Sequence, residues 1–112
     1  MKKELPPEVI SGLDDLLLKL GCKETLTKEF LALSLHNVVL FDFKQSDYGS
    51  GNISEFREYG CLVRAWDKMK RWSSLAGQKR RKPRNESLLD TLDDLSNYAL
   101  IAKLCIQGTW PK

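Results

Sequence analysis

Two segments in the second half of the chain carry the residue types that bind phosphate and metal ions. The first holds Arg64, Asp67, Lys68 and Arg71, which share one face at helical spacing. Guanidinium and ammonium groups on such a face can bind phosphate oxygens through charge-assisted hydrogen bonds. The second places carboxylates on successive helical turns, which suits Mg²⁺ because this ion takes a few oxygen ligands and keeps waters that phosphate can replace. These carboxylates belong to Glu86, Asp90, Asp93 and Asp94.

The same charges also fit a purely structural role. Arg64, Lys68 and Arg71 would then pair with Glu86, Asp90 and Asp93 across two packed helices, or both faces would be solvated. A binding site requires the two segments to line a shared cavity instead. The charge pattern leaves both hypotheses open.

A polar connector precedes the cationic segment. Residues 46–52, with the sequence SDYGSGN, have the composition of a turn and offer exposed backbone N–H groups that could cradle a phosphate. No strand precedes them, so they do not form a phosphate-loop signature, and a simple connector is the favoured interpretation. Asn52 and Glu55 form a plausible capping pair for a short helix that ends near Gly60.

Helical periodicity dominates the chain and predicts an all-α bundle of four to five helices. A first helix begins at Pro6 and Pro7 and stops at Gly21. A second runs from a cap at Thr25 or Thr27 to about residue 45 and is apolar around most of its circumference, which is typical of a central helix. The only histidine, His36, lies in it and is expected to be partly buried and structural.

The last two predicted helices carry the charged segments. The third spans about residues 61–75, and its apolar stripe is expected to be buried; the stripe contains Leu62, Ala65, Trp66, Met69 and Trp72. The fourth begins at the N-cap Asn85 and places an apolar face opposite its acidic ridge. That apolar face contains Leu88, Leu92, Leu95, Ala99 and Ile106.

Length and composition indicate one soluble domain over residues 1–112. The net charge of +3 is local, because residues 79–84 alone hold five cations, and one short basic loop is weak evidence for nucleic-acid binding. Three cysteines without metal-site spacing indicate reduced thiols. The prolines near the N-terminus and the absence of a long apolar run predict no signal peptide and no membrane span, hence a cytoplasmic protein.

Three stretches in this order resemble the nucleotide-modification-associated domain family, small proteins of bacteria and phages that are distantly similar to the all-α nucleoside triphosphate pyrophosphatases of the MazG and dimeric dUTPase group. They are KQSDYGSGN, GCLVRAWDKMKR and NESLLDTLDDLSNYA, within Phe41 to Trp110. The resemblance implies an all-α, commonly oligomeric bundle with a nucleotide pocket between helices. The functional positions it implies are Asp47, Tyr48, Asn52, Arg64, Asp67, Lys68, Arg71, Glu86, Asp90 and Asn97.

The chain departs from the MazG pattern in its second predicted helix. There the acidic pair of the family is replaced by Glu29 followed by Leu33, His36 and Asn37, so that only the last helix retains a half site for Mg²⁺, at Glu86, Asp90 and Asp94. In-line attack on a phosphoanhydride requires both an activated water and charge neutralisation. Binding does not require them, and the sequence therefore leaves open whether the protein is an enzyme.

Three hypotheses follow. The first is a homo-oligomer that binds a phosphorylated nucleotide or a nucleotide-derived signal between helices or protomers and sequesters it, as a phage protein would to disarm a host defence. The cations would hold phosphates, Tyr48 or a tryptophan would stack on a base, and Asn52 or Asn97 would contact polar edges. The second is a Mg²⁺-dependent nucleoside triphosphate pyrophosphatase. The third is an interaction module whose basic loop docks an acidic partner.

Overall fold

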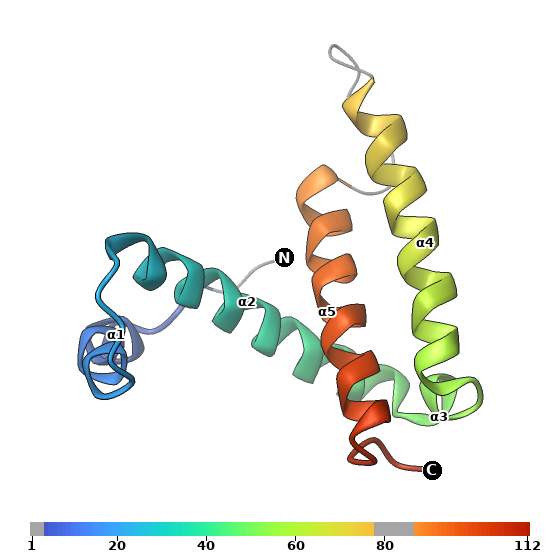
Figure 1. The fold of residues 1–112 in the computed structure, drawn as a ribbon, viewed down its shortest axis with the longest axis horizontal. Helices are drawn as coiled ribbons and strands as arrows, with labels where there is room; N and C mark the ends of the chain where they lie inside the picture. Colours follow the sequence, from blue (N-terminus) through green and yellow to red (C-terminus); the bar gives the residue numbers. More distant parts are fainter. Residues whose placement is uncertain (1–3, 78–86) are drawn as a thin grey trace. The chain divides into compact units, whose positions relative to one another are not determined.

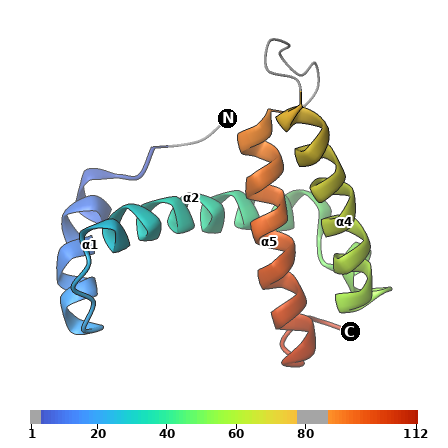
Figure 2. The ribbon, with the colours of Figure 1, turned by 45° about the horizontal axis from the view of Figure 1, so that its top comes forward.

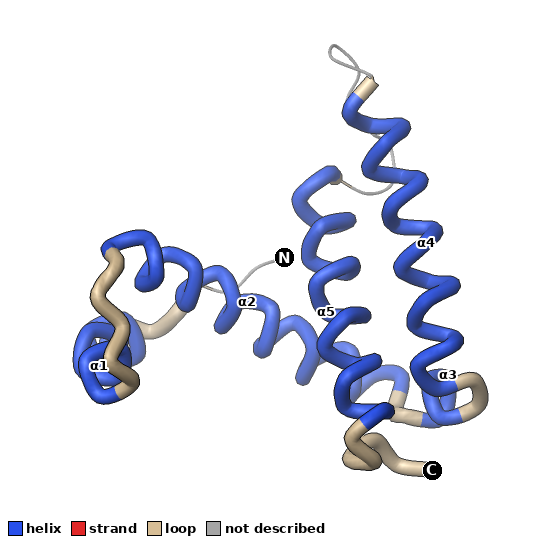
Figure 3. Tube along the Cα trace, in the orientation of Figure 1, coloured by secondary structure: helices blue, strands red, loops and turns tan. Residues whose placement is uncertain are grey.

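The computed structural model describes residues 4–77 and 87–112, and in these residues the chain forms five helices and no strand (Figures 1 and 3). This confirms the predicted all-α class. The helices are α1 (Pro7–Lys19), α2 (Thr25–Tyr48), α3 (Gly51–Ser54), α4 (Arg57–Ala76) and α5 (Leu88–Ile106). The chain divides into two compact units, Met1–Lys44 and Gln45–Lys112.

The first unit contains α1 and the larger part of α2. As predicted, α1 begins at the proline pair, where the fixed φ of Pro7 suits the first helical turn. It ends in a Schellman motif, in which Gly21 has a φ of +78° and the N–H of Cys22 donates to Leu17 O at 2.9 Å. Leu13 and Leu17 are its buried residues, and the Lys28 ammonium of α2 pairs with the Asp14 carboxylate at 3.1 Å.

The long helix α2 differs from the central, buried helix that its composition predicts. None of its residues is buried, and Phe30, Leu33 and Phe43 are each more than 60% exposed. Its apolar residues are spread around the whole circumference, so one neighbouring helix can cover only a part of them. His36 is half-buried, as expected.

The second unit is built around α4 and α5, which lie side by side and antiparallel (Figures 1 and 2). Its buried apolar side chains come from α3, α4, α5 and the C-terminal segment, and they are Ile53, Cys61, Ile101, Cys105 and Trp110. The short helix α3 contacts α4. This is a small core for a unit of this length, because much of the apolar surface of the two long helices remains outside it.

A hook at the C-terminus closes this core. Gly108, with a φ of +78°, ends α5 in a second Schellman motif and turns the chain back, so that the ring of Trp110 becomes buried. The Trp110 Nε1–H donates to Ser50 O at 3.2 Å. The Arg57 guanidinium donates to the carbonyls of Cys105 at 3.2 Å and of Trp110 at 3.3 Å. Arg57 itself has a φ of 56°, a strained value for a residue with a side chain, and its hydrogen bonds offset part of this cost.

Several helix boundaries differ from the predicted ones. α2 continues through Ser46 to Tyr48, so the first half of the expected connector is helical. α3 begins after Ser50, and α4 already begins at Arg57, passing through Gly60. The N-cap of α5 is Ser87, whose Oγ accepts the Asp90 N–H at 3.0 Å; Asn85, the predicted cap, lies outside the described residues. The observed boundaries thus differ from the predicted ones by a turn or less.

The orientation of α4 is the opposite of the predicted one. Leu62, Trp66 and Met69 were expected in the core, yet they are 58%, 62% and 50% exposed. The face that packs against α5 instead carries Cys61 and Lys68. The apolar stripe was correctly identified as a stripe, but its burial within one chain was wrong, because α5 contacts the other side of the helix.

α5, like α4, packs through a different side from the predicted one. Its buried positions are Thr91, Asn97, Ile101 and Cys105, so its contact surface includes polar residues. Of the apolar face predicted from the sequence, Ala99 and Ile106 are exposed, and Leu88, Leu92 and Leu95 are half-buried. The two helices therefore meet through their more polar sides and leave much of their apolar surface open.

Candidate functional site

The charged faces of α4 and α5 meet at the ion pair of Lys68 and Asp94. Lys68 Nζ lies 2.9 Å from Asp94 Oδ2, and the two side chains are 20% and 15% exposed. The pair is thus largely removed from bulk water while both groups still reach solvent. At this depth the attraction between the charges is stronger than on an open surface, and the desolvation of each charge is substantial.

Further polar side chains surround this pair. Arg64 and Arg71 lie one helical turn before and after Lys68 on the same side of α4, and both are half-buried, with the Nε atom of Arg71 fully covered. On α5, the Asp93 Oδ2 atom is covered and Asn97 is buried. We call these residues the α4–α5 seam: Arg64, Lys68 and Arg71 of α4 with Asp93, Asp94 and Asn97 of α5.

The seam contains the predicted cations and part of the predicted acids. The structural hypothesis expected the cations to pair with Glu86, Asp90 and Asp93, whereas Lys68 pairs with Asp94, a residue predicted to bind metal. An ion pair across the two helices is therefore present, with a different acid. Its solvent access distinguishes it from a dry seam.

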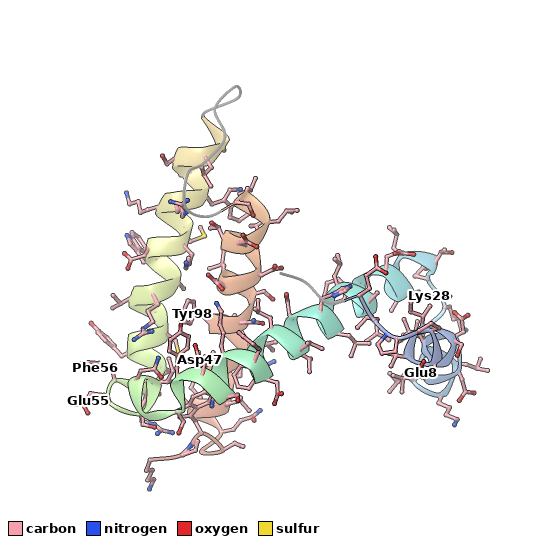
Figure 4. The ribbon with its side chains drawn as sticks, turned by 180° about the vertical axis from the view of Figure 1, so that it is seen from behind. Glu8, Lys28, Asp47, Glu55, Phe56 and Tyr98 are labelled. Carbon is pink, nitrogen blue, oxygen red and sulfur yellow. The ribbon has the colours of Figure 1, made fainter. Side chains whose placement is uncertain are left out.

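The remaining predicted nucleotide-binding residues lie outside the seam. Asp47 and Tyr48 form the end of α2, Asn52 lies in α3, and all three are exposed. Figure 4 labels Asp47 and Tyr98, which both belong to the second unit. Tyr98 lies in α5 and is half-buried. Asp67 is exposed on α4.

The predicted metal ligands fall into three different situations. Asp94 accepts the Lys68 ammonium, and Asp90 is exposed in the first turn of α5. Glu86 lies outside the described residues, as does the basic loop 79–84. Within residues 4–77 and 87–112, no group of three or more His, Cys, Asp or Glu side chains is placed to hold a metal ion.

Sequence reasoning missed Thr91 as a neighbour of the seam. Thr91 is fully buried one turn before Asp94, and its hydroxyl donates to Ser87 O at 3.1 Å. A threonine that bonds a carbonyl one turn back satisfies its own hydroxyl, so it can be buried between polar helices at low cost. Nothing in the spacing of the apolar residues identified this side of α5 as the contact side.

No protein-family model, curated protein or solved structure matches the chain. In the described part of the chain, each helix is too short or too polar to cross a membrane. The function is therefore inferred from the side chains of the seam and from the faces around it.

A double-mutant cycle on Lys68→Met and Asp94→Asn tests the energetic role of the ion pair. We expect a coupling free energy of about 1 to 3 kcal/mol, between the values of exposed pairs and of fully buried ones. Urea unfolding of the four proteins measures it. The exposed pair of Lys19 and Asp15 on α1, 3.0 Å apart, is the matched control and should give a smaller coupling. Equal values for the two pairs would show that the seam adds nothing to the interaction.

Proposed function

We propose that the protein binds a phosphorylated nucleotide, or a nucleotide-derived signal, at the α4–α5 seam and sequesters it. The observation that carries this proposal is the position of Arg64, Lys68 and Arg71, three half-buried cations on one side of α4 around an ion pair that water still reaches. Three cations at successive turns match the row of charges of a nucleotide phosphate chain.

The ion pair has a definite role in this proposal. A phosphate oxygen that approaches Lys68 replaces the Asp94 carboxylate or shares the ammonium with it. An ammonium already removed from most bulk water has lost part of its hydration, so less desolvation is needed when the ligand arrives. The arginines can add paired N–H donors with fixed geometry. In this proposal the seam is a preorganised anion site in which the Asp94 carboxylate competes with the phosphate for Lys68.

Recognition of the base would come from Asn97 in the seam and from aromatic residues outside it. Asn97, which is buried in the seam, carries an amide of the kind that contacts the polar edge of a base. Tyr48 or a tryptophan of α4 supplies a ring for stacking, and these rings are exposed in the single chain. Asp47, Asn52 and Asp67, which lie outside the seam, remain proposed ligand contacts.

The exposed apolar surface supports assembly into a homo-oligomer. On α4 the large side chains that point to solvent are Tyr59, Leu62, Val63, Trp66, Met69 and Trp72. At about half exposure each they offer roughly 600 Å² per copy, close to the ~800 Å² that each partner buries in a standard interface. A pocket closed by a second copy would enclose a nucleotide that one chain of this size leaves open.

Sequestration is favoured over hydrolysis by the composition of the helices. Where a MazG-type site has an acidic pair, this chain holds Glu29 followed by Leu33, His36 and Asn37. The retained acid Asp94 neutralises Lys68. A protein that captures the signal of a host defence needs affinity alone, and a phage anti-defence protein is the setting in which this chemistry is sufficient.

Calorimetry with a panel of mononucleotides, dinucleotides and cyclic nucleotides, without added metal, tests the proposal. Lys68→Met is expected to weaken the best ligand about 10- to 100-fold, the effect of losing one charge-assisted hydrogen bond. Lys70→Met is the control, because Lys70 is exposed on the same helix outside the seam and the change in charge is identical. The proposal fails if no nucleotide gives heat, or if both variants weaken binding equally.

Asp94→Asn separates sequestration from pyrophosphatase activity. Removing the competing carboxylate is expected to tighten nucleotide binding about 3- to 10-fold, since Lys68 is then released to the phosphate. The Mg²⁺-dependent alternative predicts the reverse, because Asp94 would be a metal ligand alongside Glu86 and Asp90. Release of pyrophosphate with Mg²⁺, abolished by Asp94→Asn, would establish the alternative.

A further inference from the structure

Two of the three cysteines face each other across the α4–α5 contact. Cys61 in the first part of α4 and Cys105 at the end of α5 are 1% and 5% exposed, and the Cys105 thiol lies close enough to Cys61 to raise the pKa of the Cys61 thiol. The backbone supports this position independently. Arg57, one turn before Cys61, donates to the Cys105 carbonyl at 3.2 Å, so the end of α5 lies at the level of the first turns of α4. The third thiol, Cys22, is exposed in the other unit.

We propose that Cys61 and Cys105 form an intramolecular disulfide when the protein meets a low-molecular-weight disulfide such as oxidised glutathione, and that this bond locks α4 to α5. This inference is independent of the proposed function. The geometry supplies the reason, because two thiols held in contact within a packed core react with each other far more readily than with a second protein molecule. Helical positions that face each other can meet the distance requirements of a disulfide with small side-chain movements.

The exchange takes place in two balanced steps. The thiolate of one cysteine attacks a sulfur of oxidised glutathione, forming a mixed disulfide and releasing one reduced glutathione. The thiol of the second cysteine loses its proton and attacks the protein sulfur of the mixed disulfide. This step forms the Cys61–Cys105 bond and releases the second reduced glutathione. The two electrons lost by the protein thiols reduce the glutathione disulfide.

The environment of Cys61 makes this reaction slow at neutral pH. Burial, followed by the neighbouring Cys105, raises the pKa of the Cys61 thiol above its ordinary value of 9.0; Arg64 opposes the shift and Glu58 adds to it. A raised pKa keeps the thiol protonated, so the nucleophilic thiolate is scarce. The rate should therefore rise about tenfold from pH 7 to pH 8, in proportion to the thiolate fraction. The two cysteines therefore form the disulfide over minutes to hours after the oxidant is added.

The test uses the Cys22→Ser protein, in which the exposed thiol cannot interfere. The protein is incubated with excess oxidised glutathione in native buffer and then analysed by intact mass and by peptide mapping without reduction. We expect the loss of two hydrogens, a linked pair of peptides that contain Cys61 and Cys105, and a melting temperature higher by roughly 5 to 15 °C. Cys61→Ala and Cys105→Ala in the same background should show no such link.

Each other outcome overturns the proposal. A protein that carries only glutathione adducts cannot complete the exchange between its two thiols in the folded state, and a protein that links the two cysteines only after urea is added does not form the bond in the folded state. A linked protein without a higher melting temperature would show that the bond does not lock the helices.

Discussion

Replacing Trp110 by alanine is expected to lower the free energy of unfolding by about 3 to 5 kcal/mol, the loss measured when a buried aromatic side chain is truncated. The ring is 3% exposed, although it belongs to the third residue from the C-terminus. Its removal leaves a cavity in the core of this unit and also breaks the hydrogen bond to Ser50 O. Urea unfolding monitored by circular dichroism measures the change.

A graded series identifies the source of this loss. Trp110→Phe keeps most of the ring and removes only the Nε1–H donor, so it should cost less, about 1 to 2 kcal/mol. If Trp110→Ala unfolds like the parent protein, the hook does not contribute to the core.

Arg57→Ala and Arg57→Gly both remove the guanidinium that binds the hook, but only glycine also relieves the positive φ. The glycine variant should therefore be the more stable of the two by about 1 kcal/mol.

Replacing Trp66 by glutamate is expected to dissociate the proposed homo-oligomer. Trp66 lies in the middle of the open apolar side of α4 and is 62% exposed in the single chain. A buried charge in place of an aromatic anchor would cost at least about 4 kcal/mol of association free energy, a change of roughly 1,000-fold in the dissociation constant. Sedimentation equilibrium over a range of concentrations measures the molar mass directly.

The control for Trp66→Glu is Gln107→Glu, which adds the same charge at an exposed position after the end of α5. This variant should retain the mass of the parent protein. Two results contradict the prediction: a parent protein that is monomeric at all concentrations, or a Trp66→Glu variant whose mass is unchanged. Either would show that this side of α4 is not a contact between copies.

The local features of the helices follow from the sequence. Pro7 begins α1 because its missing N–H has no partner in a first turn, and Gly21 ends it because the left-handed conformation carries no penalty for glycine. The helical spacing of Arg64, Lys68 and Arg71 also placed them correctly on one side of α4. Short-range geometry decides such features, so a window of one or two turns contains the necessary information.

The capping and contact residues were harder to predict. Ser87 caps α5 in place of Asn85, since both are good caps and only the packed helix selects between them. The hook depends on Arg57 and Trp110, more than fifty positions apart, and no local pattern links a guanidinium to carbonyls at that separation.

Helical periodicity is sufficient to predict the all-α class, the positions of most helices and the cations that share a side of α4. It does not reveal that α5 covers this cationic side, pairs Asp94 with Lys68 and leaves the side with Trp66 open; those contacts are visible only in the folded chain. The physical reason is that periodicity reveals two distinct sides of a helix but does not name the neighbour of each. An apolar side can be covered within the chain or by another molecule, and both choices produce the same pattern.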